Sequence, residues 1–223
     1  MPYKRRATRY VRRTKRRTST PWYNRKYTPM EIATKALKTA SALKSIINSE
    51  MLYNYDYSNY NPTSSGGVTS MVAISQGDGN LGVRTGNSIL VKKIQYRYAL
   101  SKHPTPTFDS VRIMMFVDNR QVADTAPAVT DVLNSANSKA LLNIDAEASN
   151  RFTILYDQLH LLSSIGDNYR QDAGYIPLNH HVKFNGAATT DIHKGGIYLL
   201  YISDQPTNTP VLSLAFKVCY YDN

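Results

Sequence analysis

The basic residues of this chain are concentrated at one end, and this segregation limits what that end can fold into. Residues 1–30 contain 11 Lys and Arg but no Asp or Glu, because the first acidic residue is Glu31. The other 16 basic residues are matched by all 16 acidic residues, so the formal net charge of +11 comes from this N-terminal segment. The sequence therefore joins two pieces with different physics, a polycationic arm and a neutral body.

The arm lacks the apolar residues that a folded core requires. Residues 1–27 contain no Leu, Ile or Phe, and many of their positive charges are adjacent. Little apolar burial is available to offset the conformational entropy that such a segment loses on ordering. We expect residues 1–27 to be disordered until a polyanion neutralises them.

The composition of the arm indicates that it binds single-stranded nucleic acid. Arg outnumbers Lys eight to three, and a guanidinium can bind phosphate through two hydrogen bonds or stack on a base. Counterion release predicts an affinity that falls steeply with salt and does not select bases. Tyr10, Trp22, Tyr23 and Tyr27 are candidates for stacking on unpaired bases. The expected phosphate-binding residues are Lys4, Arg5, Arg6, Arg9, Arg12, Arg13, Lys15, Arg16, Arg17, Arg25 and Lys26.

Two clusters in the arm resemble nuclear import signals, which need clustered cations in an accessible stretch. Their basic residues are Lys4, Arg5, Arg6, Arg12, Arg13, Lys15, Arg16 and Arg17. They predict a nuclear import receptor as a further partner. A mitochondrial presequence is disfavoured because the arm has no aliphatic helix face, and a secretory signal because no apolar region follows the charges.

A helix is expected directly after the arm, and residues 28–50 are assigned to this amphipathic helix and a linker. Thr28, Pro29 and Glu31 fit a capping box with proline at the first helical position. The helix should extend to about Asn48 with Lys35, Lys38 and Lys44 off its apolar stripe. The stripe consists of Ile32, Ala36, Ala40, Leu43 and Ile47.

The rest of the chain, residues 51–223, is predicted to be one all-β domain. Its strands are marked by runs rich in Val, Ile, Tyr and Phe between turn residues. They are residues 71–75, 89–100, 111–118, 152–156, 159–163, 178–184, 197–203 and 211–221. Residues 54–67 have the composition of a loop, and a short helix is expected near residues 129–134. Eight antiparallel strands predict a single jelly roll of two packed four-stranded sheets.

No pattern in the sequence indicates an enzyme, a metal site or a cofactor site. The five histidines are His103, His160, His180, His181 and His193. His180 and His181 are adjacent, so on a strand they point to opposite faces and cannot jointly bind one metal. Cys219 is the sole cysteine and cannot form an internal disulfide. The apolar run at residues 197–202 is far shorter than the roughly 20 residues that cross a bilayer, so no membrane span is expected.

Several segments resemble, in order, capsid proteins of small circular single-stranded DNA viruses, the circovirus-like, Rep-encoding group. The first is GDGNLGVRTGNSILVKKIQYR at residues 77–97. It is followed by VRIMMFVD at residues 111–118, then Ala126-Pro127 and Val132-Leu133, and by RFTILYD at residues 151–157. The ordered set covers most of the chain, and the basic amino terminus agrees with it.

The resemblance implies a capsid protein that self-assembles into a small icosahedral shell, T=1 with 60 copies. In that family the fold is a jelly roll related to small plant satellite virus capsids, with the arm inside on a single-stranded DNA genome. The resemblance further implies localisation in the virion and, during assembly, in the host nucleus. Loops at residues 103–108, 121–150 and 164–175 would then shape subunit contacts and the outer surface.

Three alternatives remain open from the sequence. The first alternative is a capsid protein of a small single-stranded RNA or satellite virus, because charge and stacking do not distinguish RNA from DNA without a site for the 2′-hydroxyl. A non-viral basic nucleic-acid-binding protein is another, although it would usually carry cations on its folded part. A jelly-roll lectin would explain the strands but not the arm.

Overall fold

The computed structural model describes residues 28–47, 51–78, 82–121 and 124–222. The arm residues assigned to phosphate binding, base stacking and nuclear import lie outside the described residues, as does the expected disorder of residues 1–27. The chain divides into two compact units, Met1–Ile46 and Ile47–Asn223.

Helix α1 (Pro29–Ile47), which the sequence predicts, lies in the first unit except for its last residue. Its start is fixed by the expected capping box. The Thr28 amide donates to Oε2 of Glu31 at 2.9 Å, and the Glu31 amide donates to Oγ1 of Thr28 at 3.3 Å. Within this unit, Ile32 and Leu43 of the apolar stripe are exposed.

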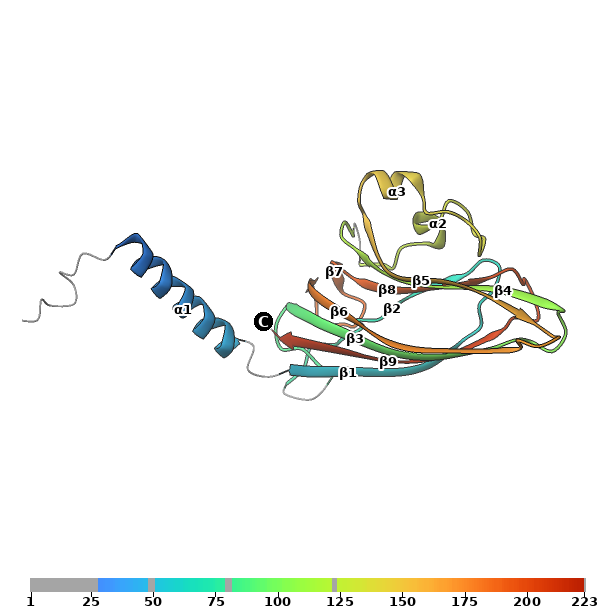
Figure 1. Ribbon diagram of the computed structural model, residues 1–223, viewed down its shortest axis with the longest axis horizontal. Coiled ribbons are helices and arrows are strands. Elements are labelled where there is room, and N and C mark those ends of the chain that lie inside the picture. The colour runs from blue at the N-terminus through green and yellow to red at the C-terminus, as the bar shows by residue number, and fades with distance from the viewer. Residues whose placement is uncertain (1–27, 48–50, 79–81, 122–123, 223) are drawn as a thin grey trace, which may run out of the picture. The chain divides into compact units, whose positions relative to one another are not determined.

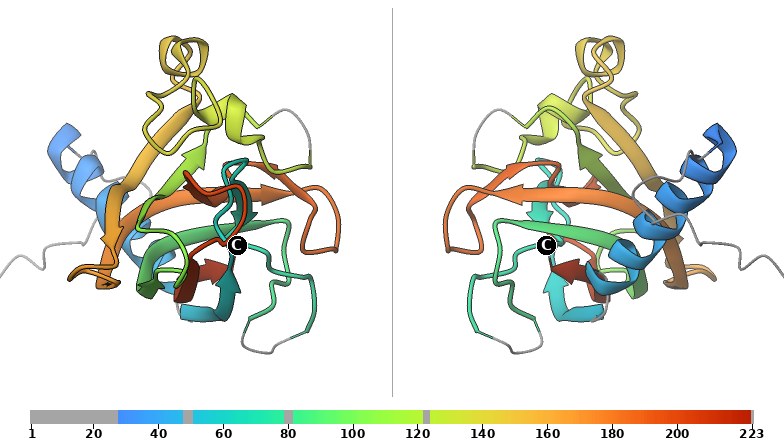
Figure 2. Two further views of the ribbon diagram at one scale, coloured as in Figure 1. Left: turned by 90° about the vertical axis from the view of Figure 1, so that its right-hand side faces the viewer. Right: turned by 90° about the vertical axis from the view of Figure 1, so that its left-hand side faces the viewer.

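The second unit is a sandwich of two antiparallel sheets (Figures 1 and 2). One sheet has the order β1-β9-β3-β6-β7 and the other β2-β8-β4-β5. The strands are β1 (Met51–Tyr60), β2 (Gly67–Ser70), β3 (Ser88–Ser101), β4 (Phe108–Asp118), β5 (Phe152–Ser163), β6 (Tyr169–Phe184), β7 (Ile192–Lys194), β8 (Ile197–Ser203) and β9 (Val211–Asp222). Except for β4–β5 and β6–β7, each strand is followed by one in the opposite sheet, which is the connectivity of a jelly roll. The all-β jelly-roll prediction is confirmed.

The strand count differs from the prediction, with nine strands in place of eight and five in one sheet. Three strands, β1, β2 and β7, overlap none of the predicted ones, whereas the expected strand at residues 71–75 is absent and two expected strands merge into β5. β1 occupies much of the expected loop at residues 54–67. Tyr53, Tyr55 and Tyr57 alternate with more buried residues along β1, a period of two that the polar composition obscured. β1 is an edge strand with its outer side open, so it needs few aliphatic residues.

Three strand boundaries also differ from the prediction. β2 ends at Ser70, and Met71, Val72 and Ile74 of the expected strand at residues 71–75 are buried without forming a ladder. Residues 152–163 form one strand rather than two, because Asp157 in the polar break forms an ion pair with Arg112 on β4. β6 begins at Tyr169, which shortens the loop expected at residues 164–175.

Two apolar cores stabilise the sandwich. The larger lies between the sheets and contains residues such as Ile94, Ile113 and Leu214. The smaller lies on the outer side of the four-stranded sheet, where residues 124–151, here called the covering segment, lie across it with α2 (Val129–Val132) and α3 (Ile144–Ala148) (Figure 1). The short helix expected near residues 129–134 is α2, whereas α3 was not predicted.

Candidate functional site

The residues that the sequence assigns to nucleic-acid binding all lie outside the described residues. Lys35 and Lys38 are exposed along α1, where the sequence placed them off the apolar stripe. The eleven basic residues of the arm and the four aromatic residues expected to stack on bases belong to residues 1–27, so their roles stay predictions.

Arg84 is the most buried basic residue of the described body, and its contacts are structural. Its side chain is 0% exposed and donates to the carbonyl oxygens of Ile74, Gly86 and Gly186, the second at 2.7 Å. Its guanidinium also lies over the Phe184 ring, 3.9 Å from the ring centre. Burial lowers the pKa of Arg84, while the charges of Asp222 and Asp191 oppose this change. Arg84 thus fixes the loop before β3 to the sandwich.

A hydrogen-bonded cluster of partly buried polar side chains joins the two sheets at the β5 and β6 side of the sandwich. The Tyr98 hydroxyl on β3 lies 2.7 Å from the Tyr156 hydroxyl and 2.7 Å from Nε2 of His160, both on β5. Tyr156 in turn donates to Asp172 on β6 at 2.8 Å. Burial raises the pKa of Tyr98 to about 12 and lowers the pKa of His160, the latter with help from the Arg170 charge. Every described member has a partner, which is what a structural network requires.

His180 and Cys219 also belong to the packed framework of the sandwich. His180 is half-buried with its Nε2 2.9 Å from the Gly195 carbonyl oxygen, and His181 points to the other face of β6. Cys219 is buried, and burial raises the pKa of its thiol. Within the described ranges, no three His, Cys, Asp or Glu side chains are grouped so that they could hold a metal ion. No helix in those ranges is long and apolar enough to cross a membrane.

The outer faces of the two sheets are different surfaces. Phe116, Tyr198 and Leu200 on the four-stranded sheet pack against Val132 and Leu133 of the covering segment. The outer face of the five-stranded sheet has no such cover in the described body, and its outward side chains include exposed tyrosines and several Lys and Arg. This open face is the main candidate binding surface among the described residues.

Comparison with known proteins identifies relatives over most of the chain. Residues 31–223 match the family described as satellite tobacco necrosis virus coat protein. The chain is 27% identical over 154 residues to the coat protein of Maize white line mosaic Satellite virus, a match covering 67% of this chain and 69% of that protein. A solved structure of Desmodium yellow mottle tymovirus has 8% sequence identity and a TM-score of 0.34, over 78% of this chain and 87% of that chain. A structure of Broad Bean Stain Virus has 9% sequence identity and a TM-score of 0.32, over 74% of this chain and 84% of that chain.

Together, the antiparallel sandwich and the family match over residues 31–223 define a viral coat protein. The chain belongs to the satellite tobacco necrosis virus coat protein family. The family and this relative are coat proteins, which are structural proteins rather than enzymes.

The resemblance to circovirus-like capsid proteins is supported only at the level of a capsid protein. The segments that suggested it are parts of the jelly roll itself. Residues 77–97 contain the loop that Arg84 anchors and the first part of β3, residues 111–118 lie in β4, and residues 151–157 open β5. They therefore indicate the fold, whereas the family match favours the satellite-virus alternative over the DNA-virus interpretation.

Proposed function

We propose that this chain assembles with copies of itself into a small icosahedral shell, T=1 with 60 subunits, and packages a single-stranded genome on its basic arm. The observation that carries the proposal is the family match over residues 31–223 to satellite tobacco necrosis virus coat protein. It favours the capsid of a small single-stranded RNA or satellite virus, so the genome is proposed to be RNA. The proposal includes no DNA preference and no nuclear import step.

The segregated charge supplies a physical drive for packaging. Sixty arms with 11 basic side chains each would present about 660 positive charges to the nucleic acid. Mutual repulsion of the arms opposes assembly until a polyanion neutralises them. The neutral body lets subunits approach one another without net like-charge repulsion.

Expression of the full chain alone tests assembly. We expect uniform spherical particles by electron microscopy that contain nucleic acid sensitive to ribonuclease after the particles are opened. A chain that stays monomeric across salt and protein concentration would contradict the proposal. Nucleic acid that resists ribonuclease and is degraded by deoxyribonuclease would overturn the RNA assignment alone.

The role of the arm is tested by substitution rather than by truncation. Replacement of its 11 Lys and Arg by Gln should abolish retention of nucleic acid while the far-ultraviolet circular dichroism of the body stays unchanged. The matched control replaces Thr8, Thr14, Thr18 and Thr20 by Ala, which changes the same segment without altering its charge. Retention by the Gln variant equal to that of the control would contradict the assigned role.

A further inference from the structure

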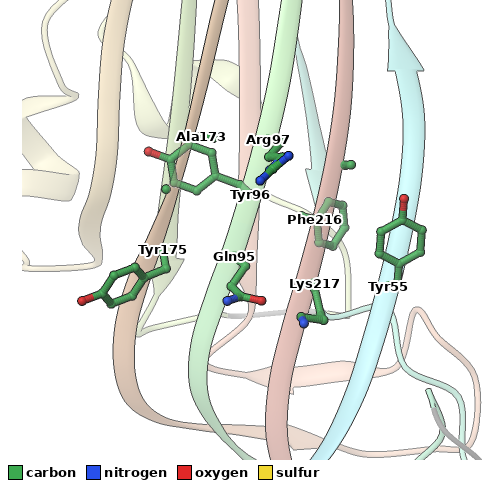
Figure 3. Close-up of a pocket in the computed structure, with 10 residues that line it drawn as sticks. Tyr55, Gln95, Tyr96, Arg97, Ala173, Tyr175, Phe216 and Lys217 are labelled. Carbon is green, nitrogen blue, oxygen red and sulfur yellow. The ribbon is translucent and has the colours of Figure 1, made fainter.

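A row of outward side chains crosses four strands of the five-stranded sheet. In the strand register Tyr55 on β1 lies opposite Lys217 on β9, Lys217 opposite Gln95 on β3, and Gln95 opposite Tyr175 on β6. Figure 3 shows these four side chains along one line across the strands. Their chain neighbours Tyr96 and Phe216 point into the core, as the alternation of side chains in a strand requires.

Small residues beside this row leave a hollow between the two tyrosines. Arg97 lies opposite Ala215 and Ala173 in the adjacent row, and Gly174 also contributes to the lining. The hollow is open to solvent and has a volume of about 480 Å³. Three strand spacings separate Tyr55 from Tyr175, about 14 Å. Tyr55 and Tyr175 are 66% and 69% exposed, so their ring faces are accessible.

The electrostatics of this face are one-sided. The outward residues of β1, β9, β3 and β6 include Lys93, Arg97 and Lys217 but no Asp or Glu. Within the described residues, none of these three cations forms an ion pair with a carboxylate. Lys217 lies instead over the Tyr53 ring, with its Nζ 5.4 Å from the ring centre. The charge on this face has no compensation from within the described chain.

A like-charge pair continues the cationic surface to the far edge of the sheet. Lys183 on β6 lies directly opposite Lys194 on β7, and both are exposed. Like charges directly opposite each other on neighbouring strands are destabilising. An anion bound at this edge would remove that cost.

We infer that the outer face of the five-stranded sheet is a second binding surface for single-stranded nucleic acid, with unpaired bases stacked on Tyr55 and Tyr175 and phosphates bound by Lys93, Arg97 and Lys217. Aromatic residues stack on bases of any sequence, and cations beside them follow the backbone. The Gln95 amide, which both donates and accepts hydrogen bonds, lies between the two stacking positions. This inference rests on the proposed function, because the ligand is the packaged nucleic acid.

The order of the chain supports the same occupant. Residues 48–50 alone separate α1 from β1, the strand that carries Tyr55. Nucleic acid held by the arm is therefore tethered to the polypeptide that forms this face, which raises its effective concentration there. Like-charge repulsion between the two sets of cations disfavours a second copy of the same face as the occupant.

The stacking part is tested on the full-length protein with a fluorescent 20-nucleotide oligouridine RNA. The variant Tyr55→Ala/Tyr175→Ala is expected to bind it about tenfold more weakly or worse, since each stack contributes appreciably to affinity. Tyr55→Phe/Tyr175→Phe keeps the aromatic faces and should bind as the wild type does. An unchanged melting temperature shows that both variants are folded.

The electrostatic part is tested by the salt dependence of the same binding. Arg97→Gln/Lys217→Gln should reduce the magnitude of the slope of log K against log salt by about 1.4, because each phosphate contact on a single strand contributes about 0.7. The matched control Arg120→Gln/Lys139→Gln removes two exposed cations outside this face and should change the slope less. Equal slopes for the two double variants would overturn the inference.

Cross-linking separates this inference from the proposed function. Oligouridine containing 4-thiouridine should cross-link to peptides that carry Tyr55 or Tyr175 as well as to the arm. Cross-links confined to residues 1–27, with unchanged affinity of the Ala variant, would overturn the inference and leave the proposed function standing. Loss of particles by the Ala variant without loss of RNA affinity would assign the face to contacts between copies and also overturn it. A wild-type protein that binds no RNA would overturn the proposed function itself.

Discussion

The two outer faces of the sandwich belong to sheets of the same domain, yet their surfaces differ in kind. On the four-stranded sheet, Phe116, Tyr198 and Leu200 face outward and are buried under the covering segment. On the five-stranded sheet, the outward positions hold Tyr55, Lys217 and other polar or small residues that remain accessible. A sheet face with large apolar residues must be covered, whereas a cationic face with tyrosines can stay in water until a polyanion arrives.

The largest expected effect tests whether the covered face is a true core. Phe116→Ala should lower the free energy of unfolding by about 3–5 kcal/mol, because the ring is buried against Phe152 and Tyr198. Tyr55→Ala on the open face should change it by no more than about 0.5 kcal/mol. Guanidinium unfolding followed by circular dichroism measures both. Similar losses of unfolding free energy in the two variants would contradict the distinction between a covered and an open face.

The covering segment is also held at its end by a partly buried ion pair. Arg151, just before β5, contacts the fully buried Asp118 at the end of β4 at 2.9 Å. Arg151→Ala leaves that carboxylate buried without its cation and should cost about 3 kcal/mol. Arg170→Ala removes an exposed ion pair with Asp167 and should cost under about 1 kcal/mol. If denaturant unfolding gave the same cost for both, the ion pair of Arg151 would not help to retain the cover.

The pH dependence of stability should come from groups between the sheets rather than from either outer face. Burial lowers the pKa of His160 and of His180, so below about pH 6.5 the unfolded chain binds protons that the folded chain does not. The free energy of unfolding should therefore fall as the pH drops from 7.5 to 5.5. The loss should be smaller than the losses expected for Phe116→Ala and Arg151→Ala. His160→Gln/His180→Gln should flatten the dependence of the melting temperature on pH. His193→Gln, at an exposed site, should leave it as steep as in the wild type.

The smallest expected effect concerns Cys219, which lies on the open side of β9 but is 0% exposed. Its register neighbours are Tyr53 and Lys93, and burial raises the pKa of the thiol while the Lys93 and Lys217 charges oppose this. The thiol should react slowly with Ellman's reagent at pH 8, and Tyr53→Ala should accelerate the reaction several-fold. Little loss of stability is expected, within about 0.5 kcal/mol. Fast labelling of the wild type would show that the open face is less closely packed than described.

Part of the open face was detectable in the sequence but was misread. Tyr53, Tyr55 and Tyr57 alternate with Asn54, Asp56 and Ser58, which is the period of a strand. The abundance of Asn, Ser and Tyr around them led to the expectation of a loop. Arg97 and Lys217 were each on predicted strands, but nothing in the sequence places two strands 120 residues apart in adjacent positions of one sheet.

The sequence by itself determined the properties that depend on neighbours in the chain. Charge segregation, the capping box of α1, most strands and the jelly-roll class follow from local composition and periodicity, because these act over a few residues. Only the tertiary structure decided that Tyr55, Lys217, Gln95 and Tyr175 form one row and that residues 124–151 cover one sheet and not the other. Strand order and long-range packing are set by contacts between distant segments, and those contacts leave no periodic trace in the sequence.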